Sequence, residues 1–150
     1  MNPDECLFCK IIKGEIPSKK VHEDSSVLAF LDINPANPGH TLVLPKKHAE
    51  DITSMQETDL IKTMEVVKII TTKLKENMHA EGVNILQNNG RAAGQLVSHV
   101  HFHVVPRFHG DNVMISYPKI QISDGEMDSI CKKLIGEHYT PARRDMDLEF

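Results

Sequence analysis

The sequence has few of the features that place a chain in a special class. Its 150 residues include no tryptophan, two tyrosines and three cysteines, and no apolar run reaches the length of a membrane span. Residues 1–10 lack the apolar core of a signal peptide. The formal net charge is −4 with neutral histidines, which excludes a broad basic surface for duplex DNA or RNA. We therefore expect a cytoplasmic protein without a membrane or nucleic-acid partner.

The length fits one domain over residues 1–150, large enough to bury a core without disulfide bonds. An odd number of cysteines in a reducing compartment argues against a disulfide framework. Histidine is the residue in excess, because the chain has nine and three of them fall within five positions. This clustering indicates that histidine side chains carry the chemistry of the protein.

Hydrophobic periodicity predicts an α+β protein. The expected helices lie near 5–13, over about 57–80 and near 124–138. The expected strands lie at Val21 and over 27–31, 41–44, 83–86 and 99–108. Because the strands form a meander with one long helix before the last pair, we expect an antiparallel sheet rather than a doubly wound parallel one.

Several finer features of the helices are also predicted. The apolar stripe of the long helix is expected to run through Leu60, Met64, Val67, Ile70 or Thr71, Leu74 and Met78. Gly82 would be the C-cap of that helix. Ser123 or Asp124 would cap the third helix, within which Cys131 would be a buried small residue. The last dozen residues are expected to form a tail.

Three histidines alternate with apolar residues in the last expected strand. Successive side chains of a strand face opposite sides, so His99, His101 and His103 would line a solvent-side face while their neighbours enter the core. Two chemistries could use this row: metal ligation by three imidazoles, or nucleophilic attack by one of them. Alternate Cβ atoms of a strand are about 6.5–7 Å apart, which makes three ligands on one tetrahedral ion awkward. The spacing therefore favours a nucleophile.

Residues 99–105 (HVHFHVV) resemble the histidine-triad motif, with Gly94-Gln95 at the usual offset before it. Residues 8–17 and 29–48 resemble further blocks of the Hint branch of the histidine-triad (HIT) superfamily, in particular bacterial members with a C-x-x-C pair. The resemblance covers about residues 6–108 in one collinear order. It implies the HIT-like fold: a five-stranded antiparallel sheet with one long helix and a short N-terminal helix. Here an extra C-terminal helix and a tail would follow over 111–150.

The resemblance also implies a purine nucleotide site in which His101 is the nucleophile. The carbonyl of His99 would hold the Nδ1–H of His101, and Asp32 would accept hydrogen bonds from the ribose hydroxyls. The base would be enclosed by five apolar residues: Phe8, Ile11, Phe30, Ile33 and Leu42. The phosphate would be contacted by Asn88, Gln95 and His103, with His40 close by.

The activity implied by the resemblance is hydrolysis of purine nucleoside phosphoramidates of the AMP-amine type, by a homodimer and without a catalytic metal. The α-phosphorus would pass through a nucleotidyl-histidine intermediate. Two alternatives stay open: a diadenosine polyphosphate hydrolase of the Fhit type, which Pro106-Arg107 resembles more, and a largely non-catalytic nucleotide- or partner-binding module. Leu96 stands where both branches commonly carry serine or threonine, so the resemblance does not fix the leaving group.

Cys6 and Cys9 form a C-x-x-C pair with no strand before it, which is a poor match to a thioredoxin-like redox site. The pair alone is compatible with a metal site or with two reduced structural cysteines. The resemblance to some bacterial members implies that His48 and His99 complete it. Such a Cys2His2 set would hold a closed, tetrahedral and therefore structural zinc ion.

Overall fold

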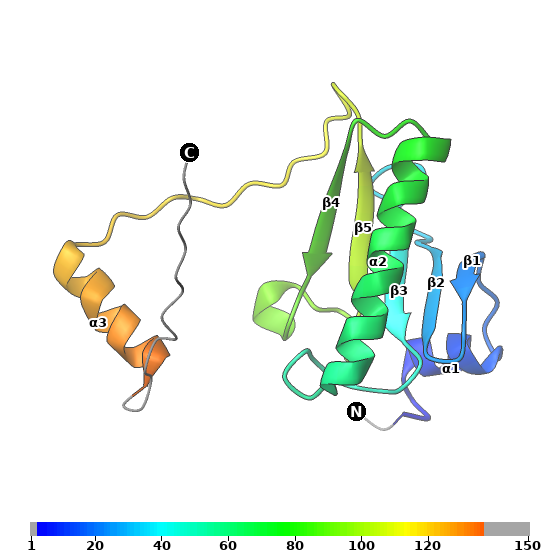
Figure 1. The fold of residues 1–150 in the computed structure, drawn as a ribbon, viewed down its shortest axis with the longest axis horizontal. Coiled ribbons are helices and arrows are strands. Elements are labelled where there is room, and N and C mark those ends of the chain that lie inside the picture. The colour runs from blue at the N-terminus through cyan, green and yellow to red at the C-terminus, as the bar shows by residue number, and fades with distance from the viewer. Residues whose placement is uncertain (1–2, 137–150) are drawn as a thin grey trace, which may run out of the picture. The chain divides into compact units, whose positions relative to one another are not determined.

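The computed structural model describes residues 3–136, which divide into two units between Met114 and Ile115. The first unit contains five strands: β1 Lys20–Glu23, β2 Val27–Leu31, β3 Thr41–Pro45, β4 Gly82–Gln87 and β5 Phe102–Arg107. They form one sheet in the order β1-β2-β3-β5-β4, in which every neighbouring pair is antiparallel (Figure 1). The predicted α+β class and five-stranded antiparallel sheet are confirmed.

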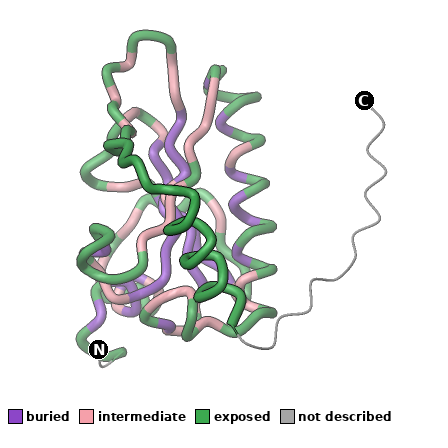
Figure 2. Tube along the Cα trace, turned by 90° about the vertical axis from the view of Figure 1, so that its left-hand side faces the viewer, coloured by how far each residue is buried: buried purple, intermediate pink, exposed green. Residues whose placement is uncertain are grey.

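The long helix α2, Glu57–Asn77, covers one face of this sheet (Figure 1). Its buried positions follow one side of the helix, as the purple segments of Figure 2 show. They are Thr63, Val66, Val67, Ile70 and Leu74. They pack with sheet residues such as Val43, Phe102 and Val104. The Thr63 hydroxyl enters this core because it donates to the Asp59 carbonyl at 2.7 Å.

The short helix α1, Leu7–Lys13, belongs to the apolar layer on the opposite face. This layer consists of Cys6, Phe8, Cys9 and Ile11 together with Leu28, Phe30, Leu42 and Leu44 of the sheet. The sequence of strand β2 is therefore a continuous apolar run, because helices cover both faces of the strand. His103 of β5 pairs across the sheet with Leu42, which belongs to this second layer.

Three predictions about these strands and helices are wrong. Strand β5 begins at Phe102 rather than at residue 99, because the Val100 amide donates to the carbonyl of Ala49 outside the ladder. Helix α2 ends at Asn77, and Gly82 starts β4 instead of capping the helix. The predicted stripe is wrong at Met64 and Met78, which are each 40% exposed, because the buried face passes through Val66 and the helix ends before Met78.

The second unit contains helix α3, Asp124–Ile135. Ser123 caps it as predicted, with a reciprocal capping box to Glu126. Cys131 is exposed rather than buried, because the described part of this helix buries none of its residues. The helix ends at Ile135, before the predicted end near 138, and the expected tail lies outside the described residues. Within residues 3–136, no helix combines the length and the hydropathy that a membrane span requires.

Candidate active site and metal cluster

The three histidines of the motif lie on the α1 side of the sheet. The ring centroids of His101 and His103 are 5.0 Å apart, and Phe8 of α1 packs edge-on against His101 at the same distance. His99 is fully buried and His101 is 6% exposed. The predicted solvent-side face is therefore wrong for these two residues, because α1 and the segment before it cover them. His103 is half-buried.

The carbonyl of His99 determines which nitrogen of His101 carries the proton. Nδ1 of His101 lies 2.7 Å from that oxygen. Since a carbonyl only accepts, Nδ1 is the N–H and Nε2 keeps its lone pair. Burial lowers the pKa of His101, so the ring is neutral at neutral pH. A neutral imidazole with a free Nε2 can attack an electrophilic centre.

A second group joins His103 to the loop before β3. His40 Nε2 lies 2.9 Å from His103 Nδ1, and one carboxylate oxygen of Asp32 lies 3.7 Å from His40 Nε2. Burial lowers the pKa of His40. Burial, together with the neighbouring His101 and His40, lowers the pKa of His103 to about 4. At neutral pH a carboxylate therefore stands beside two neutral imidazoles.

The cysteine pair meets two histidines at the amino-terminal end of α1. Cys6, Cys9, His48 and His99 each offer one ligand atom within 4.8 Å of the others. The two Nδ1 atoms are 3.3 Å apart. The sulfur–nitrogen distances are 3.4 Å from Cys9 to His48 and 3.6 Å from each cysteine to His99.

These separations match the edges of a metal tetrahedron. With zinc–nitrogen bonds of about 2.0–2.1 Å and zinc–sulfur bonds of about 2.3 Å, the corners of a tetrahedral site are about 3.3–3.8 Å apart. The tautomer fits as well, because His99 donates from Nε2 to the carbonyl of Pro45 at 2.9 Å and turns the lone pair of Nδ1 toward the thiols. Burial and the nearby Cys6 raise the pKa of the Cys9 thiol to about 11, and a divalent cation would stabilise the thiolate. The residues present fit a tetrahedral metal ion.

Residues 13–110 match the family described as HIT domain. The chain belongs to the HIT domain family. A HIT-like protein of Methanocaldococcus jannaschii is 49% identical over 131 residues, which cover 87% of this chain and 99% of the relative. The adenosine 5′-monophosphoramidase of Schizosaccharomyces pombe is 38% identical over 130 residues, covering 86% and 95% of the two chains.

One similar solved structure is of a zinc-bound protein. The zinc-bound histidine triad family protein from Mycobacterium smegmatis superimposes with a TM-score of 0.71 at 40% identity, covering 75% of this chain and 82% of that one. The comparisons by sequence and by structure both match the family that the motif at residues 99–105 indicates.

The HIT domain brings most of the predicted nucleotide-site residues to the α1 side. Phe8, Ile11, Phe30 and Leu42 belong to one buried cluster, beside His101 and His103. Ile33 is 91% exposed. The side-chain amide of Gln95 is engaged by backbone groups: it donates to the carbonyls of Val97 and of Glu50 between β3 and α2, and it accepts from the Gly90 amide. No hydrogen bond joins the Asn88 side chain to the histidines within residues 3–136.

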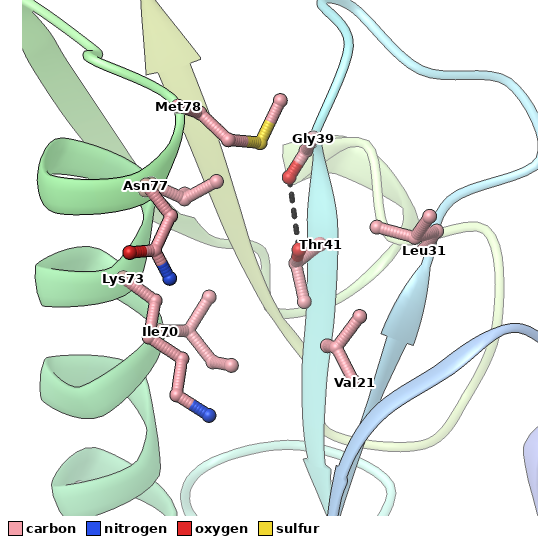
Figure 3. A pocket seen from close by; sticks show the side chains of 9 residues that line it. Val21, Leu31, Gly39, Thr41, Ile70, Lys73, Asn77 and Met78 are labelled. Atoms are coloured by element: carbon pink, nitrogen blue, oxygen red, sulfur yellow. Dashed lines mark hydrogen bonds between the residues drawn. The ribbon is translucent and has the colours of Figure 1, made fainter.

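A pocket on the other face of the HIT domain contains none of these residues. It lies between α2 and strands β1–β3, and Figure 3 shows Met78 over Gly39 at its rim. Its lining is mostly apolar: Val21, Leu31, Gly39, Thr41, Ile70, Lys73, Leu74, Asn77 and Met78. A Cβ atom at Gly39 would lie 2.7 Å from the Met78 sulfur, so glycine allows this close approach of loop and helix.

Sequence reasoning missed a polar network at the far end of β5. Asp111 accepts from Arg107 Nε at 2.7 Å and from the side-chain amide of Asn37 at 2.8 Å. Arg107 also donates to Asn84 and to the carbonyl of Val113. Asn37 and Asp111 are 74 positions apart, and neither belongs to a motif, so no local pattern indicates their contact.

Proposed function

We propose that this HIT domain protein hydrolyses purine nucleoside phosphoramidates of the AMP-amine type at the α-phosphorus. The observation that supports this most directly is the tautomer of His101, whose Nδ1–H is held by the His99 carbonyl while Nε2 is free. The name of the Schizosaccharomyces pombe relative, adenosine 5′-monophosphoramidase, points to the same chemistry.

The reaction proceeds in two displacements. Nε2 of His101 forms a bond to phosphorus while the phosphorus–nitrogen bond of the substrate breaks, and the departing amine takes up one proton from solvent. Water then attacks the nucleotidyl-histidine, the phosphorus–imidazole bond breaks, and AMP and one proton are released. His101 returns to its neutral form, so covalent catalysis divides one difficult step into two easier ones.

The neighbouring residues bind and orient the nucleotide. The carboxylate of Asp32, whose side chain is 16% exposed, accepts from the ribose hydroxyls. Phe8, Ile11, Phe30 and Leu42, with Ile33 at the rim, surround the purine. His103 and Asn88 donate to the phosphoryl oxygens. Gln95 supports them by holding the loop between η1, Arg91–Ala93, and the triad, and His99 orients His101.

A panel of substrates assayed side by side tests this proposal. We expect turnover of an AMP-amine to exceed that of a dinucleoside polyphosphate and of a nucleotide sulfate, and an AMP-protein adduct to form on His101. Preferential cleavage of the dinucleoside polyphosphate would assign the Fhit type instead. AMP binding with no turnover of any substrate would leave a nucleotide-binding module. Arg107 gives no support to the Fhit type, because Asp111 and Asn84 hold its guanidinium.

We further propose that the Cys6–Cys9–His48–His99 cluster binds one structural zinc ion per chain. The tetrahedral separations of the four ligand atoms support this. Zinc would join the start of α1 to the residue whose carbonyl orients His101. The thiols have to be reduced to bind it, which agrees with a cytoplasmic location.

Elemental analysis of protein purified without chelator decides the zinc proposal. We expect about one equivalent of zinc per chain, lost in the double variant Cys6→Ser with Cys9→Ser and retained in Cys131→Ser, whose thiol is exposed. Occupancy should fall at acidic pH, because the thiolates become protonated. Less than a tenth of an equivalent of any transition metal would exclude the site. Complete loss of activity on chelation, with the fold intact, would instead indicate a catalytic metal.

A further inference from the structure

We propose that the pocket between α2 and strands β1–β3 binds a small carboxylate whose apolar part is about the size of one ring. The apolar part would lie among the side chains of the pocket, and the carboxylate would bind Lys73 and Asn77 at its rim (Figure 3). This site is separate from the nucleotide site and does not depend on the proposed function.

The lining of the pocket is mostly apolar. Ile70 and Leu74 of α2 are buried there, at 3% and 5% exposed, whereas Val21 of β1 and Leu31 of β2 are 40% and 37% exposed. Contact with an apolar group would remove these two exposed side chains from water, which is favourable. The pocket therefore offers binding free energy to the apolar part of a ligand.

The size of the pocket limits that apolar part. Its volume is about 160 Å³, and an apolar cavity of about 150 Å³ is large enough for one benzene ring. Met78 lies over Gly39 at the rim, and a thioether side chain is flexible, so this wall can adapt to the shape of a ring. A single ring therefore fits, whereas a whole nucleotide exceeds the space.

The charge at the rim selects an anion. Lys73 and Asn77 are four positions apart, which places them side by side on one face of α2. Figure 3 shows both side chains directed from the helix toward the strands. Within residues 3–136 no hydrogen bond or ion pair engages the Lys73 ammonium or the Asn77 side-chain amide. None of the nine lining residues is acidic, so a carboxylate can accept from both donors without a competing anion.

Lys73 has to provide most of this selectivity, because the helix end does not. α2 ends at Asn77, and the C-terminal end of a helix carries a partial negative charge, which opposes an anion. The Leu74 carbonyl in this turn already accepts from the amides of Met78 and Ala80, at 3.2 Å each. The full positive charge of Lys73 outweighs the partial charge of the helix end. Removal of Lys73 should therefore remove the preference for a carboxylate.

Strand β3 separates this pocket from the nucleotide site. Thr41 lines the pocket, and its hydroxyl is engaged because it donates to the Gly39 carbonyl at 2.8 Å. The next residue, Leu42, belongs to the apolar layer on the α1 side of the sheet. Successive residues of a strand face opposite sides, so the two sites can be occupied together. AMP is therefore not expected to compete with the carboxylate.

Methyl NMR spectra of the intact protein, labelled at methionine and valine methyl groups, test the site with phenylacetate as the probe. We expect saturable shifts of the Met78 and Val21 methyl signals with a Kd of about 1 mM, because the probe has few atoms. Met64 is the internal control, since it is equally exposed on α2 but does not line the pocket. The shifts should persist with saturating AMP. No saturable shift of Met78, or displacement of phenylacetate by AMP, would overturn the inference.

A matched pair of lysine variants tests the carboxylate. Lys73→Met should weaken phenylacetate binding by about fivefold or more, because a charge-assisted hydrogen bond is lost. Lys75→Met removes the same charge from an exposed position of the same helix outside the pocket, and should leave the Kd nearly unchanged. Phenylacetamide, which has the same ring without the charge, should bind the wild type as weakly as phenylacetate binds Lys73→Met. Equal losses in the two variants, or equal binding of the two probes, would exclude the carboxylate assignment.

Two further measurements distinguish a small ligand from other occupants. Val21→Glu places a negative charge at the pocket and should abolish phenylacetate binding without a change in thermal unfolding, because Val21 is exposed on an edge strand. Unchanged binding in this variant would show that the probe lies elsewhere. Dilution of the wild type without a probe should not move the Met78 signal. A shift of Met78 on dilution would show that a second copy of the chain covers the pocket, and would overturn the small-ligand proposal.

Discussion

His101 is held from two sides, by the His99 carbonyl at Nδ1 and by the ring of Phe8 at its edge. His101→Ala removes the nucleophile, so we expect turnover to fall to well below a tenth of the wild-type rate. Since the ring is buried, the variant should also lose about 1–3 kcal/mol of unfolding free energy. It should still bind AMP, which calorimetric titration would show, because the ribose and base contacts lie elsewhere.

A matched control for this variant is His109→Ala, whose ring is exposed and pairs with Glu81. We expect normal turnover and nearly normal stability. If His101→Ala kept a tenth of the wild-type rate or more, His101 could not be the nucleophile. Steady-state kinetics of the two variants and the wild type provide the comparison.

The depressed pKa of His103 predicts lower stability in acid. The unfolded chain takes up a proton near pH 6.5, whereas folded His103 takes it up only at about 4, so the unfolded state binds more protons between these values. The free energy of unfolding should therefore fall as pH decreases from about 6.5 to about 4, despite the nearby Asp32. Urea titrations at several pH values measure this. A slope no smaller in His103→Gln than in the wild type would rule out His103 as its source.

At the scale of elements, Gly14 ends α1 in the left-handed conformation with φ of 81°. A Cβ atom there would meet nothing within 4 Å, so Gly14→Ala introduces backbone strain alone. We expect a loss of about 1 kcal/mol in unfolding free energy and an unchanged kcat. Thermal unfolding and kinetics measure the two effects.

Gly125→Ala serves as the control for this strain. Gly125 lies inside α3 with open space around it and without a positive φ, so alanine should not destabilise the protein. A Gly14→Ala variant as stable as Gly125→Ala would show that the cap of α1 does not limit stability.

Element types could be predicted from sequence because they depend on local periodicity. The alternation over residues 99–104 correctly sent Val100, Phe102 and Val104 into the core with α2. The start of β5 could not be predicted, since it depends on the Val100 amide pairing with Ala49. The burial of His101 is equally non-local, because α1 arrives from the other end of the chain.

In the candidate site, too, the residues of local motifs could be predicted from the sequence, whereas contacts between distant segments could not. The family motif indicated the histidines and Asp32, while the contact of Asn37 with Asp111 has no counterpart in local pattern. The amide of Gln95 was expected at the phosphate, yet it donates to the carbonyl of Val97 in its own loop and to the carbonyl of Glu50, 45 positions away. Contacts between segments far apart in sequence could be identified only from the three-dimensional structure.

At the scale of the whole molecule, α1 connects the two proposed sites. Phe8 packs against His101, and the adjacent Cys9 belongs to the metal cluster. Loss of the metal would therefore loosen the base pocket and the support of His99 together. We therefore expect the double cysteine variant to lose thermal stability and part of its activity, because the proposed nucleophile His101 is not one of the four metal ligands.

We predict that the protein is a homodimer, because apolar side chains are exposed beside a free edge of the sheet. β4 is an edge strand, and Ile85 pairs with Val104, so it lies on the α2 side of the sheet. Ile85 is 46% exposed, and the outer face of the adjacent α2 exposes Ile61 and Ile69 as well. We propose that a second copy covers this apolar surface, because exposed apolar groups beside a free strand edge favour association.

Light scattering at micromolar concentration should give twice the chain mass of 16.9 kDa. Ile85→Lys should shift the protein toward the monomer, because it places a charge where apolar surface would be buried. Val21→Lys is the matched control: Val21 is similarly exposed but lies on β1, the opposite edge of the sheet. It should leave the mass unchanged. A wild-type mass of one chain would contradict the dimer, and equal effects of the two variants would place its interface away from β4.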